Sequence, residues 1–526
     1  MRYLGTWALS ITILSAACSS GHGAPRDQGS VGAGGSPGAG ASGGASGGAS
    51  GSGGTTSASS GSGGTGAGEG SAGGAGGGPA EPAPCEPLAP GQQLAFPGAE
   101  GFGRLSSGGR GGDVCHVTHL DDAGPGSLRD CVSAGGRTVV FDTGGWITLD
   151  SDLGITQSNI TIAGQTAPGG GVGVRGRKLS VGGDNIIVRF LRVRRGIVAT
   201  TARGDAMTVS SAASNVIIDH CSVGFGTDEN LSMPGDEGVG PKDLTVQWSI
   251  VAWGLARNNH SAGSLLTASN TTIHHSVYAF NGTRNPKARS EDGRVLDFVN
   301  NVVYGWNAPD PHGEAQGWNI SKHPFIMADT SNGMHYANAV GNYFVSHGAR
   351  TATQAFVSGA ANADGVPTYN LYFEGNLLDG NGNGTLDVSS EDWSMVGTAT
   401  QLNERLPAPR VCADDAPRAF ARVMAGVGAV IPARDEVDAL LVRHIGEQDG
   451  IKIQDESDLG VGADGYGELA SGTPRTDTDG DGMPDAWEVD RRLDPDNADD
   501  RNGDDDEDGY TNLEEHLNEL AAPAFR

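Results

Sequence analysis

The chain of 526 residues is longer than one ordinary domain needs. Its formal net charge of −29 excludes a generally basic surface of the kind that binds nucleic acid. Residues 477–526 hold 18 Asp and Glu against 4 Arg, so much of the negative charge lies in the tail and the remainder is only moderately acidic.

Residues 1–18 have the features of a secretory signal. Arg2 supplies the positive charge, residues 4–17 are largely apolar but too few to span a membrane, and small residues precede Cys18. The stretch Leu14-Ser15-Ala16-Ala17-Cys18 resembles a bacterial lipoprotein signal, although Ser15 stands where leucine is usual. We expect a secreted protein, held at the outer membrane or cell surface through a lipid on Cys18.

Residues 19–84 are mostly Gly, Ser and Ala and contain almost no large apolar side chain. Such a composition cannot offset the entropy lost on ordering, so we expect a flexible tether. The folded part is then predicted to consist of a large domain at 85–465 and a small one at 470–526.

Five cysteines remain after Cys18 in a compartment that favours disulfides. A Cys115–Cys131 pair is the first choice because the two flank one short segment, and Cys85–Cys412 would join the ends of the large domain. Cys221 is expected to be unpaired in the core. The alternative is that most of these residues are buried free thiols.

One short phrase recurs from residue 158 to residue 376. A polar residue, usually Asn or Asp, leads a run of β-branched or aromatic residues, and the first five copies start 26 to 30 residues apart. The copies begin at Asn159, Asn185, Asn215, Leu244, Thr272, Phe298, Ala339 and Asn370.

Short strands at this interval, with Gly-rich connections between them, are typical of a parallel β-solenoid whose coils bury their faces on one another. A β-sandwich would need turns every 8 to 12 residues or so, and an α/β fold would need helices between the strands. We therefore predict an all-β fold. One helix is expected at 435–445, where Val437, Leu440 and Leu441 share a face that would cover the solenoid.

Cationic residues gather at two places outside the tail. Each group could bind a polyanion, or it could simply form a solvent-exposed surface. The first consists of Arg189, Arg192, Arg194 and Arg195, and the second of Arg284, Lys287, Arg289 and Arg294.

Five stretches, in this order, are similar to the pectate lyases of polysaccharide lyase family 1, in the variant typical of environmental bacteria. They lie at 95–103, 124–130, 162–169, 215–220 (Asn215-Val216-Ile217-Ile218-Asp219-His220) and 284–287 (Arg284-Asn285-Pro286-Lys287). The similarity is strong from Phe96 to about Trp306 and thin beyond. It implies a right-handed parallel β-helix and β-elimination on de-esterified homogalacturonan, which leaves a 4,5-unsaturated end.

The chemistry of that reaction asks for the same residue types. The C5 proton of a uronate is weakly acidic until the neighbouring carboxylate is neutralised, which Ca²⁺ and Arg or Lys can do. The resemblance assigns Asp205 and Asp228 to the catalytic Ca²⁺. A second Asp is frequent in the family four residues further on, where this chain has Ser232, so Glu229 is the candidate replacement. The alternative is that Asp205 and Asp228 only cap turns.

The resemblance assigns Arg284 to the residue proposed to abstract the C5 proton, and Arg289 to a residue that holds a uronate carboxylate. Lys287 is a third basic position. A free guanidinium has a pKa above about 12, so Arg284 could instead stabilise the carbanion while hydroxide removes the proton.

A substrate-binding lysine of many family members is replaced by Ala262, and the nearby His260 is the candidate substitute. Asp219 and His220 are expected to satisfy polar groups of the scaffold at a strand end.

The tail holds two loops with the oxygen spacing of an EF-hand. No incoming helix precedes the first loop, so the tail is more similar to dockerin-like or thrombospondin-type calcium repeats, and a structural Ca²⁺ is expected. The alternative is a disordered acidic tail. The predicted ligands are Asp477, Asp479, Asp481, Met483, Asp485 and Glu488 in the first loop, and Asp504, Asp506, Asp508, Tyr510, Asn512 and Glu515 in the second.

The sequence thus predicts a monomeric, calcium-dependent pectate lyase acting on polygalacturonate. A lyase for another uronate or for methyl-esterified pectin is the first alternative, and the retained Asp205 and Asp228 argue against the calcium-free pectin lyases. A polygalacturonase would need a cluster of catalytic aspartates, which the sequence lacks. A non-catalytic β-helix that binds or adheres to polysaccharide is the second alternative, because Ser232 and Ala262 depart from the family pattern.

Overall fold

The structure, a computed structural model, describes residues 85–525 except 236–239, 258, 291–292, 318–321, 329–332 and 358–366. The predicted signal at 1–18 and tether at 19–84 lie outside the described residues. The chain divides into two compact units, Met1–Gly76 and Gly77–Arg526, and only the second is considered below. Among the described residues, none of the helices combines the length and apolar character that crossing a bilayer requires.

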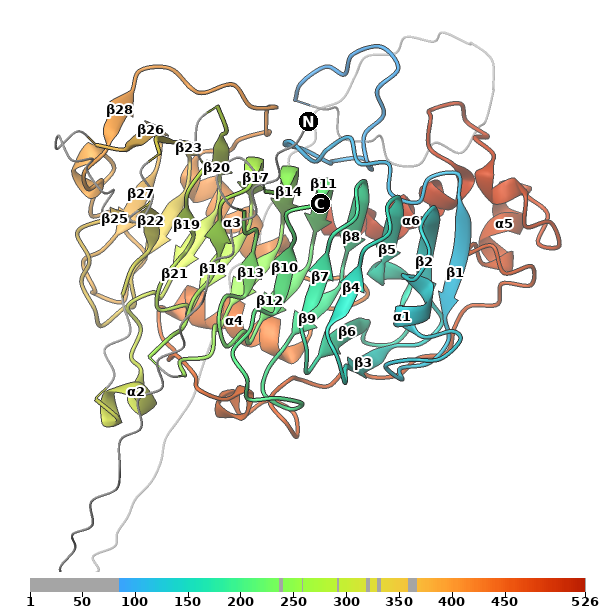
Figure 1. Cartoon of the computed structure of the whole chain (residues 1–526), viewed down its shortest axis with the longest axis horizontal. Helices are drawn as coiled ribbons and strands as arrows, with labels where there is room; N and C mark the ends of the chain where they lie inside the picture. Colours follow the sequence, from blue (N-terminus) through green and yellow to red (C-terminus); the bar gives the residue numbers. More distant parts are fainter. Residues whose placement is uncertain are drawn as a thin grey trace, which may run out of the picture. The chain divides into compact units, whose positions relative to one another are not determined.

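The second unit is a parallel β-helix, which confirms the predicted all-β class. Its strands pair in parallel between successive coils, and a typical coil contributes one strand to each of three faces. Figure 1 shows these strands stacked side by side along the unit.

The first face is a sheet of eleven strands. They are β1 (Asp113–Val117), β2 (Arg137–Phe141), β5 (Ile160–Ala163), β8 (Ile186–Arg189), β11 (Ser214–Asp219), β14 (Lys242–Gln247), β17 (Ser269–His274), β20 (Leu296–Val299), β23 (His335–Val340), β26 (Tyr369–Glu374) and β28 (Thr400–Leu402).

The second face is a sheet of nine strands. They are β3 (Gly145–Thr148), β6 (Val172–Arg175), β9 (Arg192–Arg194), β12 (Ser222–Gly224), β15 (Ile250–Ala252), β18 (Val277–Ala279), β21 (Val302–Tyr304), β24 (Tyr343–Val345) and β27 (Leu377–Asp379).

The third face consists of two sheets of four strands each. One contains β4 (Leu153–Ile155), β7 (Leu179–Val181), β10 (Met207–Val209) and β13 (Leu231–Ser232), and the other contains β16 (Leu265–Leu266), β19 (Lys287–Ala288), β22 (Phe325–Met327) and β25 (Phe356–Val357).

The helices are short and peripheral. They are α1 (Leu128–Cys131), α2 (Pro311–Ala315), α3 (Ala416–Gly426), α4 (Glu436–Glu447), α5 (Asp485–Arg491) and α6 (Asn512–Ala521), with 3₁₀ turns at Gly164–Thr166, Trp393–Met395, Glu456–Leu459, Asp500–Asn502 and Ala522–Phe525.

The recurring phrase of the sequence corresponds to the strands of the eleven-stranded sheet from β5 to β26. The leading Asn159, Asn185 and Asn215 have φ of 60°, 55° and 53°, a left-handed conformation that asparagine tolerates better than most residues. Their side chains also form a ladder, since Asn185 Nδ2 donates to Asn159 Oδ1 at 3.0 Å and Asn215 Nδ2 donates to Asn185 Oδ1 at 2.6 Å. The repeat therefore encodes both a turn and the contact between coils.

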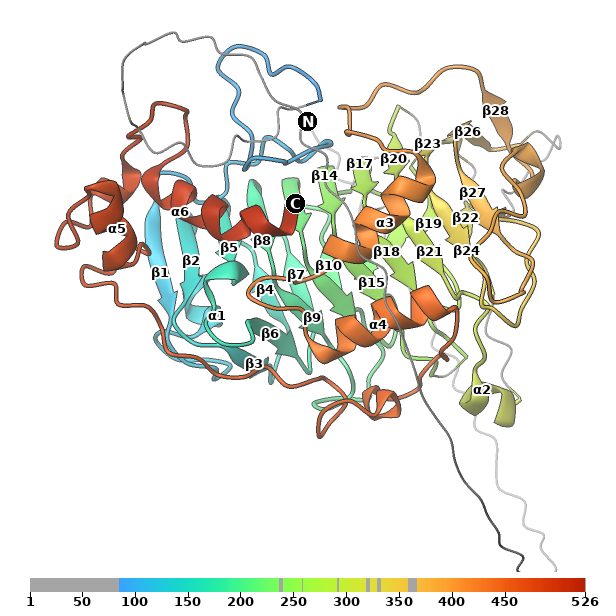
Figure 2. The same ribbon diagram turned by 180° about the vertical axis from the view of Figure 1, so that it is seen from behind.

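The nine-stranded sheet is covered by helices, whereas the four-stranded sheets carry none in the two opposite views of Figures 1 and 2. Helix α4 confirms the predicted helix, and its Val437 and Leu441 are buried against Ile250 and Val277 of the nine-stranded sheet. The face formed by the four-stranded sheets is therefore not covered by any of the helices seen in these views, and we call it the uncovered face.

The first cationic cluster is buried, so its interpretation as a solvated face is wrong. Arg192 Nε lies 2.7 Å from Asp435 Oδ2, and Arg194 contacts both Asp435 and Asp438 at 2.8 Å. Burial opposes ionisation of Asp435, but the charges of Arg194 and Arg192 outweigh it and lower its pKa to about 2. These pairs fasten the N-terminal turn of α4 to β9.

Asp219 and His220 lie inside the scaffold, fully buried. Asp219 accepts from Arg189 Nε at 2.9 Å and from Gln247 Nε2 at 2.9 Å, and it contacts His220 Nδ1 at 2.8 Å. This placement agrees with the scaffold role expected from the sequence.

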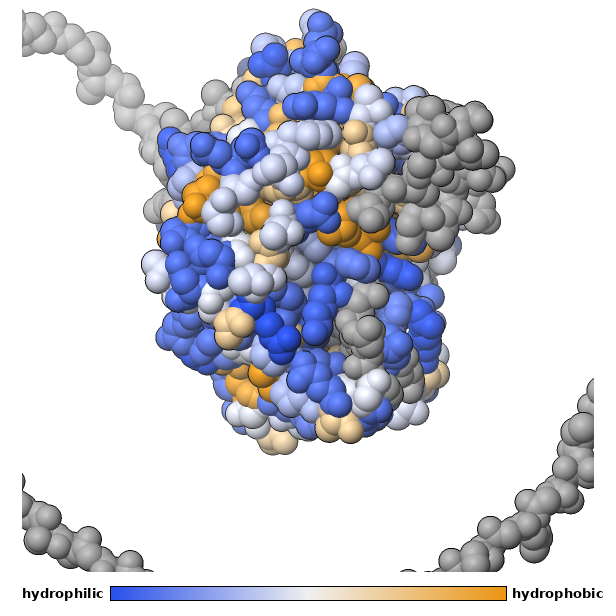
Figure 3. Space-filling model, turned by 90° about the vertical axis from the view of Figure 1, so that its left-hand side faces the viewer, coloured by the Kyte–Doolittle hydropathy of each residue, from blue (hydrophilic) through white to orange (hydrophobic). Residues whose placement is uncertain are grey.

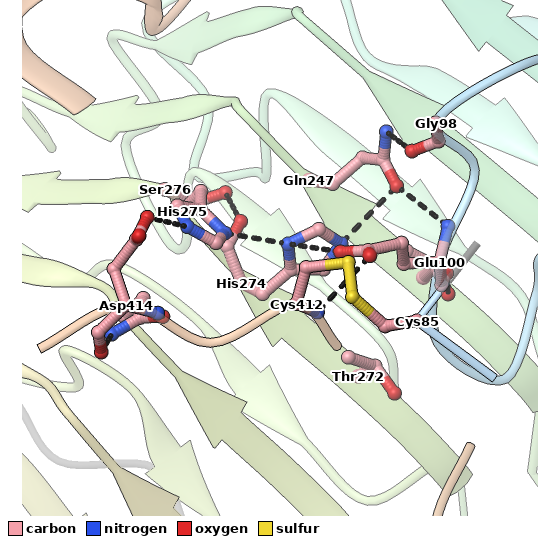
Figure 4. A network of polar contacts seen from close by, with 12 residues as sticks. Cys85, Gly98, Glu100, Gln247, Thr272, His274, His275, Ser276, Cys412 and Asp414 are labelled. Carbon is pink, nitrogen blue, oxygen red and sulfur yellow. Dashed lines mark hydrogen bonds and ion pairs between the residues drawn. A yellow bond between two sulfur atoms is a disulfide. The ribbon is translucent and has the colours of Figure 1, made fainter. Parts of the chain in front are cut away.

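A polar network continues from Gln247 across the next strand (Figure 4). Gln247 Oε1 accepts from the Glu100 backbone N–H and lies 3.1 Å from His274 Nε2. His274 Nδ1 is 2.9 Å from His275 Nδ1, and Glu100 accepts from the Cys412 backbone N–H at 3.0 Å. The network therefore ties the segments around residues 100 and 412 to β14 and β17.

Both predicted disulfides are present, Cys85–Cys412 and Cys115–Cys131, and Cys221 is a buried free thiol as expected. The first disulfide joins Cys85, the first residue that the structure describes, to Cys412, which lies 327 residues later in the sequence.

Polar and apolar residues are interspersed on the face at the end of the unit near β25–β28 (Figure 3). The large apolar side chains that are exposed in the described part are few and separate in sequence: Val198, Leu386, Val388, Ile451 and Val489.

Candidate functional site

The predicted catalytic residues lie in the connections that lead from the nine-stranded sheet to the four-stranded sheets. Asp205 precedes β10, Asp228 and Glu229 precede β13, His260 precedes β16, and Arg284 precedes β19. Because these strands belong to successive coils, residues far apart in the sequence reach one place on the uncovered face (Figure 1).

The register between coils aligns these residues. Glu229 pairs with Ala262, which pairs in turn with Thr283, immediately before Arg284. Met207 pairs with Leu231, and the Glu229 backbone N–H donates to Asp205 Oδ1 at 3.2 Å. The structure therefore brings Asp205, Asp228, Glu229 and Arg284 together.

The three carboxylates differ in environment. Burial raises the pKa of Asp205, hydrogen bonds from Thr208 and Ser232 oppose this, and the charge of Asp228 adds to it. Burial also opposes ionisation of Asp228, but hydrogen bonds from His260 and Arg203 outweigh it and lower the pKa of Asp228 to about 2. Ser232, the residue that departs from the family pattern, is thus one of the groups that oppose the rise in the pKa of Asp205.

Each of two carboxylates is paired with a cation. The nearly buried Glu229 forms an ion pair with Arg284. Asp228 Oδ1 lies 2.7 Å from Arg203 Nη2 and 3.0 Å from His260 Nε2. Arg203, whose side chain is 57% exposed, was missed in the sequence, where its only signal is its position two residues before Asp205.

The donor set suits a hard divalent cation. Ligand atoms of Asp228, Glu229 and His260 all lie within 4.8 Å of one another, and Asp205 adjoins Glu229. Carboxylate oxygens are what Ca²⁺ prefers, while an imidazole nitrogen is a poor ligand for it. The three acidic residues therefore fit calcium, and His260 fits better as a hydrogen-bonding partner of Asp228.

The other residues predicted to bind substrate, Lys287 and Arg289, lie in β19 and directly after it. Lys287 is in β19, mostly buried, and its neighbour across the ladder is Leu265. The Arg289 backbone N–H donates to Leu266 O at 2.8 Å. Ala262 lies fully buried in the ladder between Glu229 and Thr283, so a long side chain there would need to leave the core.

The first C-terminal loop places most, but not all, of its predicted ligands together. Ligand atoms of Asp477, Asp479 and Asp481 lie within 4.8 Å of one another. Asp481 and Glu488 form a second such group, whose third member is Asp500, a residue that the loop spacing did not predict. Asp485 instead accepts from the backbone N–H and hydroxyl of Thr478 at 2.8 Å. The Met483 side chain packs in an apolar cluster, which leaves its prediction untested because that loop position binds through the backbone carbonyl.

The second loop is more exposed. Asp504, Asp506 and Asp508 have ligand atoms within 4.8 Å of one another. Asn512 points elsewhere, because its Nδ2 donates to Asp500 O at 2.8 Å and its Oδ1 accepts from the Asp505 N–H. Tyr510 is buried under the Arg110 guanidinium, and Glu515 lies in α6.

No family model matches the sequence. The chain is 38% identical over 441 residues to probable pectate lyase C of Aspergillus flavus, covering 82% of this chain and 95% of that protein. Probable pectate lyase C of Aspergillus fumigatus is 38% identical over 442 residues with the same coverage. A solved structure of a pectate lyase bound to a hexasaccharide is similar with a TM-score of 0.45 and 14% identity, covering 65% of this chain and 99% of that chain.

Similarity of this extent to the curated relatives, on a parallel β-helix, defines the chain as a polysaccharide lyase. This similarity favours a lyase over the alternative of a non-catalytic β-helix that binds polysaccharide. The chain belongs to the pectate lyase family. The bacterial variant and the calcium-repeat character of the tail stay predictions.

Proposed function

We propose that the protein is a calcium-dependent pectate lyase that cleaves de-esterified homogalacturonan by β-elimination. The observation that carries this proposal is the meeting of Asp205, Asp228, Glu229 and Arg284 on the uncovered face, although they come from separate coils. Such a group can hold a cation and a guanidinium against one sugar unit.

Asp205, Asp228 and Glu229 would hold the calcium ion. Calcium bound there neutralises the uronate carboxylate and makes the C5 proton more acidic. Arg284 and Arg203 lie against Glu229 and Asp228, so their charges would compete with calcium for these two carboxylates.

Arg284 would act at C5, either by taking the proton or by stabilising the carbanion while hydroxide takes it. The electrons of the C5–H bond form the C4–C5 double bond and the C4–O bond breaks. The glycosidic oxygen stays on C1 of the other sugar and takes up a proton from water, which gives the hydroxyl of a new reducing end. Lys287 and Arg289 are the residues we assign to neighbouring uronate carboxylates. His260, which the sequence suggested for the same role, would instead act through Asp228.

The test measures unsaturated products by absorbance when purified protein is mixed with polygalacturonate and Ca²⁺. EDTA should abolish the signal, and Arg284→Ala should reduce kcat by at least about 10²-fold, as expected for loss of a proton-transfer group. Arg418→Ala is the matched control, because Arg418 is 70% exposed on α3 and should leave the rate unchanged.

Each other outcome identifies a different activity. New reducing ends without absorbance would indicate a hydrolase. Activity that prefers methyl-esterified pectin and resists EDTA would indicate a pectin lyase. Activity on a different polyuronate alone would keep the elimination chemistry but change the substrate.

Export supports this substrate, because homogalacturonan is an extracellular polymer. Two disulfides are stable where the compartment is oxidising, in agreement with the signal-like residues 1–18. We propose a lyase that is exported and held at the surface by lipid on Cys18, through a tether at 19–84.

A further inference from the structure

The C-terminal segment, residues 470–525, packs on the first coils of the β-helix. Met483, Leu513 and Leu517 form an apolar cluster with Ala163 of β5, and Val114 of β1 packs against it. Arg110 donates to Glu514 at 2.9 Å, and His116 Nε2 of β1 lies 3.1 Å from Gly480 O. Figures 1 and 2 both show α5 and α6 beside β1, β2 and β5.

Five carboxylates of this segment converge in two overlapping groups. Asp481 belongs to both, together with Asp477 and Asp479 in one and with Glu488 and Asp500 in the other. They come from a loop, from α5 and from the 3₁₀ turn at Asp500–Asn502.

The most buried of these carboxylates have oxygens that no hydrogen-bond donor in the described part of the chain reaches, although Asp481 Oδ1 accepts from the Met483 backbone N–H at 2.8 Å. Glu488 is 0% exposed and Asp481 is 1% exposed. Both oxygens of Glu488, and Oδ2 of Asp481, lack a hydrogen-bond partner among the described residues, as do both oxygens of Asp479 and Oδ1 of Asp500.

Buried carboxylates are normally paired or bound to a metal. The imidazole of His116 approaches this group, with its Nε2 3.8 Å from Asp477 Oδ2. One imidazole cannot balance five acidic groups. The donors are all carboxylate oxygens with neither thiolate nor imidazole among them, a set that selects Ca²⁺ over zinc or copper.

We propose that one calcium site is built from these five carboxylates and latches the C-terminal segment onto the first coils of the lyase. The expected ligand Asp485 is replaced by Asp500, which lies just before the second loop. Because Asn512 of α6 donates to Asp500 O at 2.8 Å, an ion at this site would join the first loop, α5 and the start of α6. The site is separate from the proposed catalytic calcium and goes beyond the lyase activity.

The test follows trypsin cleavage within the segment, at Arg491, Arg492 and Arg501, with EDTA or with Ca²⁺. The full chain carries Asp205→Asn and Asp228→Asn so that the proposed catalytic site cannot respond to calcium. Calcium should slow cleavage of this background at least tenfold. Asp500→Asn should remove that protection, while the matched control Asp499→Asn should keep it.

A second readout separates a ligand from a merely structural residue. Without calcium, Asp500→Asn should resist trypsin at least as well as the background, because it removes one repelling charge. With calcium at 100 times its Kd, the background should gain about 3 °C in Tm and the Asp500→Asn variant should gain none.

The proposal is overturned if calcium protects Asp500→Asn as well as Asp499→Asn, or if calcium gives the background no protection. Lyase activity of the otherwise unchanged chain is assayed in parallel. If calcium does not protect the segment from trypsin but the chain still shows calcium-dependent elimination, the latch is refuted and the proposed function stands. If calcium protects the segment but the chain shows no elimination, the proposed function is refuted and the latch stands.

Discussion

Replacing Asp219 by Asn tests whether the most family-like motif of the chain is scaffold or catalyst. The substitution keeps the size of the side chain and an oxygen that can still accept from Gln247, but it removes the charge that balances Arg189. The side chains of Arg189 and Asp219 are 3% and 0% exposed, so water cannot replace the lost partner.

Leaving one member of a buried ion pair uncompensated costs about 3–5 kcal/mol. The retained hydrogen bond to Gln247 and the Phe96 ring, whose centroid lies 3.7 Å from the Arg189 guanidinium carbon, favour the lower end, about 3 kcal/mol. With about 2.1 cal/mol/K of unfolding entropy per residue over roughly 440 residues, that loss lowers Tm by only about 3 °C. Chemical denaturation is therefore the more sensitive measurement.

The expected result is a loss of about 3 kcal/mol in the free energy of unfolding, with kcat unchanged well below Tm. Asp243→Asn on the following coil is the matched control. Asp243 has φ of 57° and accepts from Asn270 in the turn ladder, where asparagine is equally suited, so we expect a change within about 0.5 kcal/mol. A hundredfold loss of kcat in Asp219→Asn with unchanged stability would refute the scaffold assignment.

Two further predictions concern charges. Burial raises the pKa of Glu100 to about 7, so its contribution to stability is complete below about pH 4.5 and is lost as pH rises through 7. Between pH 4.5 and 8 the free energy of unfolding of the wild type should therefore fall by about 3 kcal/mol relative to that of Glu100→Gln. Denaturant unfolding at each pH measures this difference, and a difference that does not change with pH would contradict the prediction. Arg203→Gln should lower the calcium concentration for half-maximal activity by up to about fivefold, since an exposed ion pair is worth at most about 1 kcal/mol, and should raise KM. Weaker activation by calcium would show that Arg203 does not compete with the ion.

The sequence predicted one strand of each coil because that strand carries two signals at once. Its β-branched run is preceded by Asn or Asp at a left-handed turn, as at Asn185 and Asn215. The strands of the other two faces are often two or three residues long, as in β12 and β13, and such a length leaves no periodicity to read. These short strands could be inferred only from the requirement that each coil of a β-helix returns to the sheet where it began.

The buried arginines of β9, in contrast, are residues whose partners the sequence could not predict. Arg192 and Arg194 alternate along β9 as solvent-facing residues of a strand would, yet α4 from more than 240 residues later covers them and supplies Asp435 and Asp438. A sequence in which partners lie so far apart gives no sign of the pairing. Cationic residues in a β-helix can therefore be assigned to solvent or substrate only after the covering segments are placed.

The same reasoning separates the two proposed calcium sites. The proposed catalytic residues were predicted by resemblance, but their convergence depends on the register between β10 and β13, which also pairs Ser232 with Thr208, close to Asp205. In the C-terminal segment the local spacing predicted Asp485, whereas the fold commits that carboxylate to Thr478 and brings Asp500 instead. Spacing within the first loop predicted Asp477, Asp479, Asp481 and Glu488, which do lie together, but it could not indicate Asp500, which lies outside that loop. We therefore expect the coupling of the two loops to depend on Asp500.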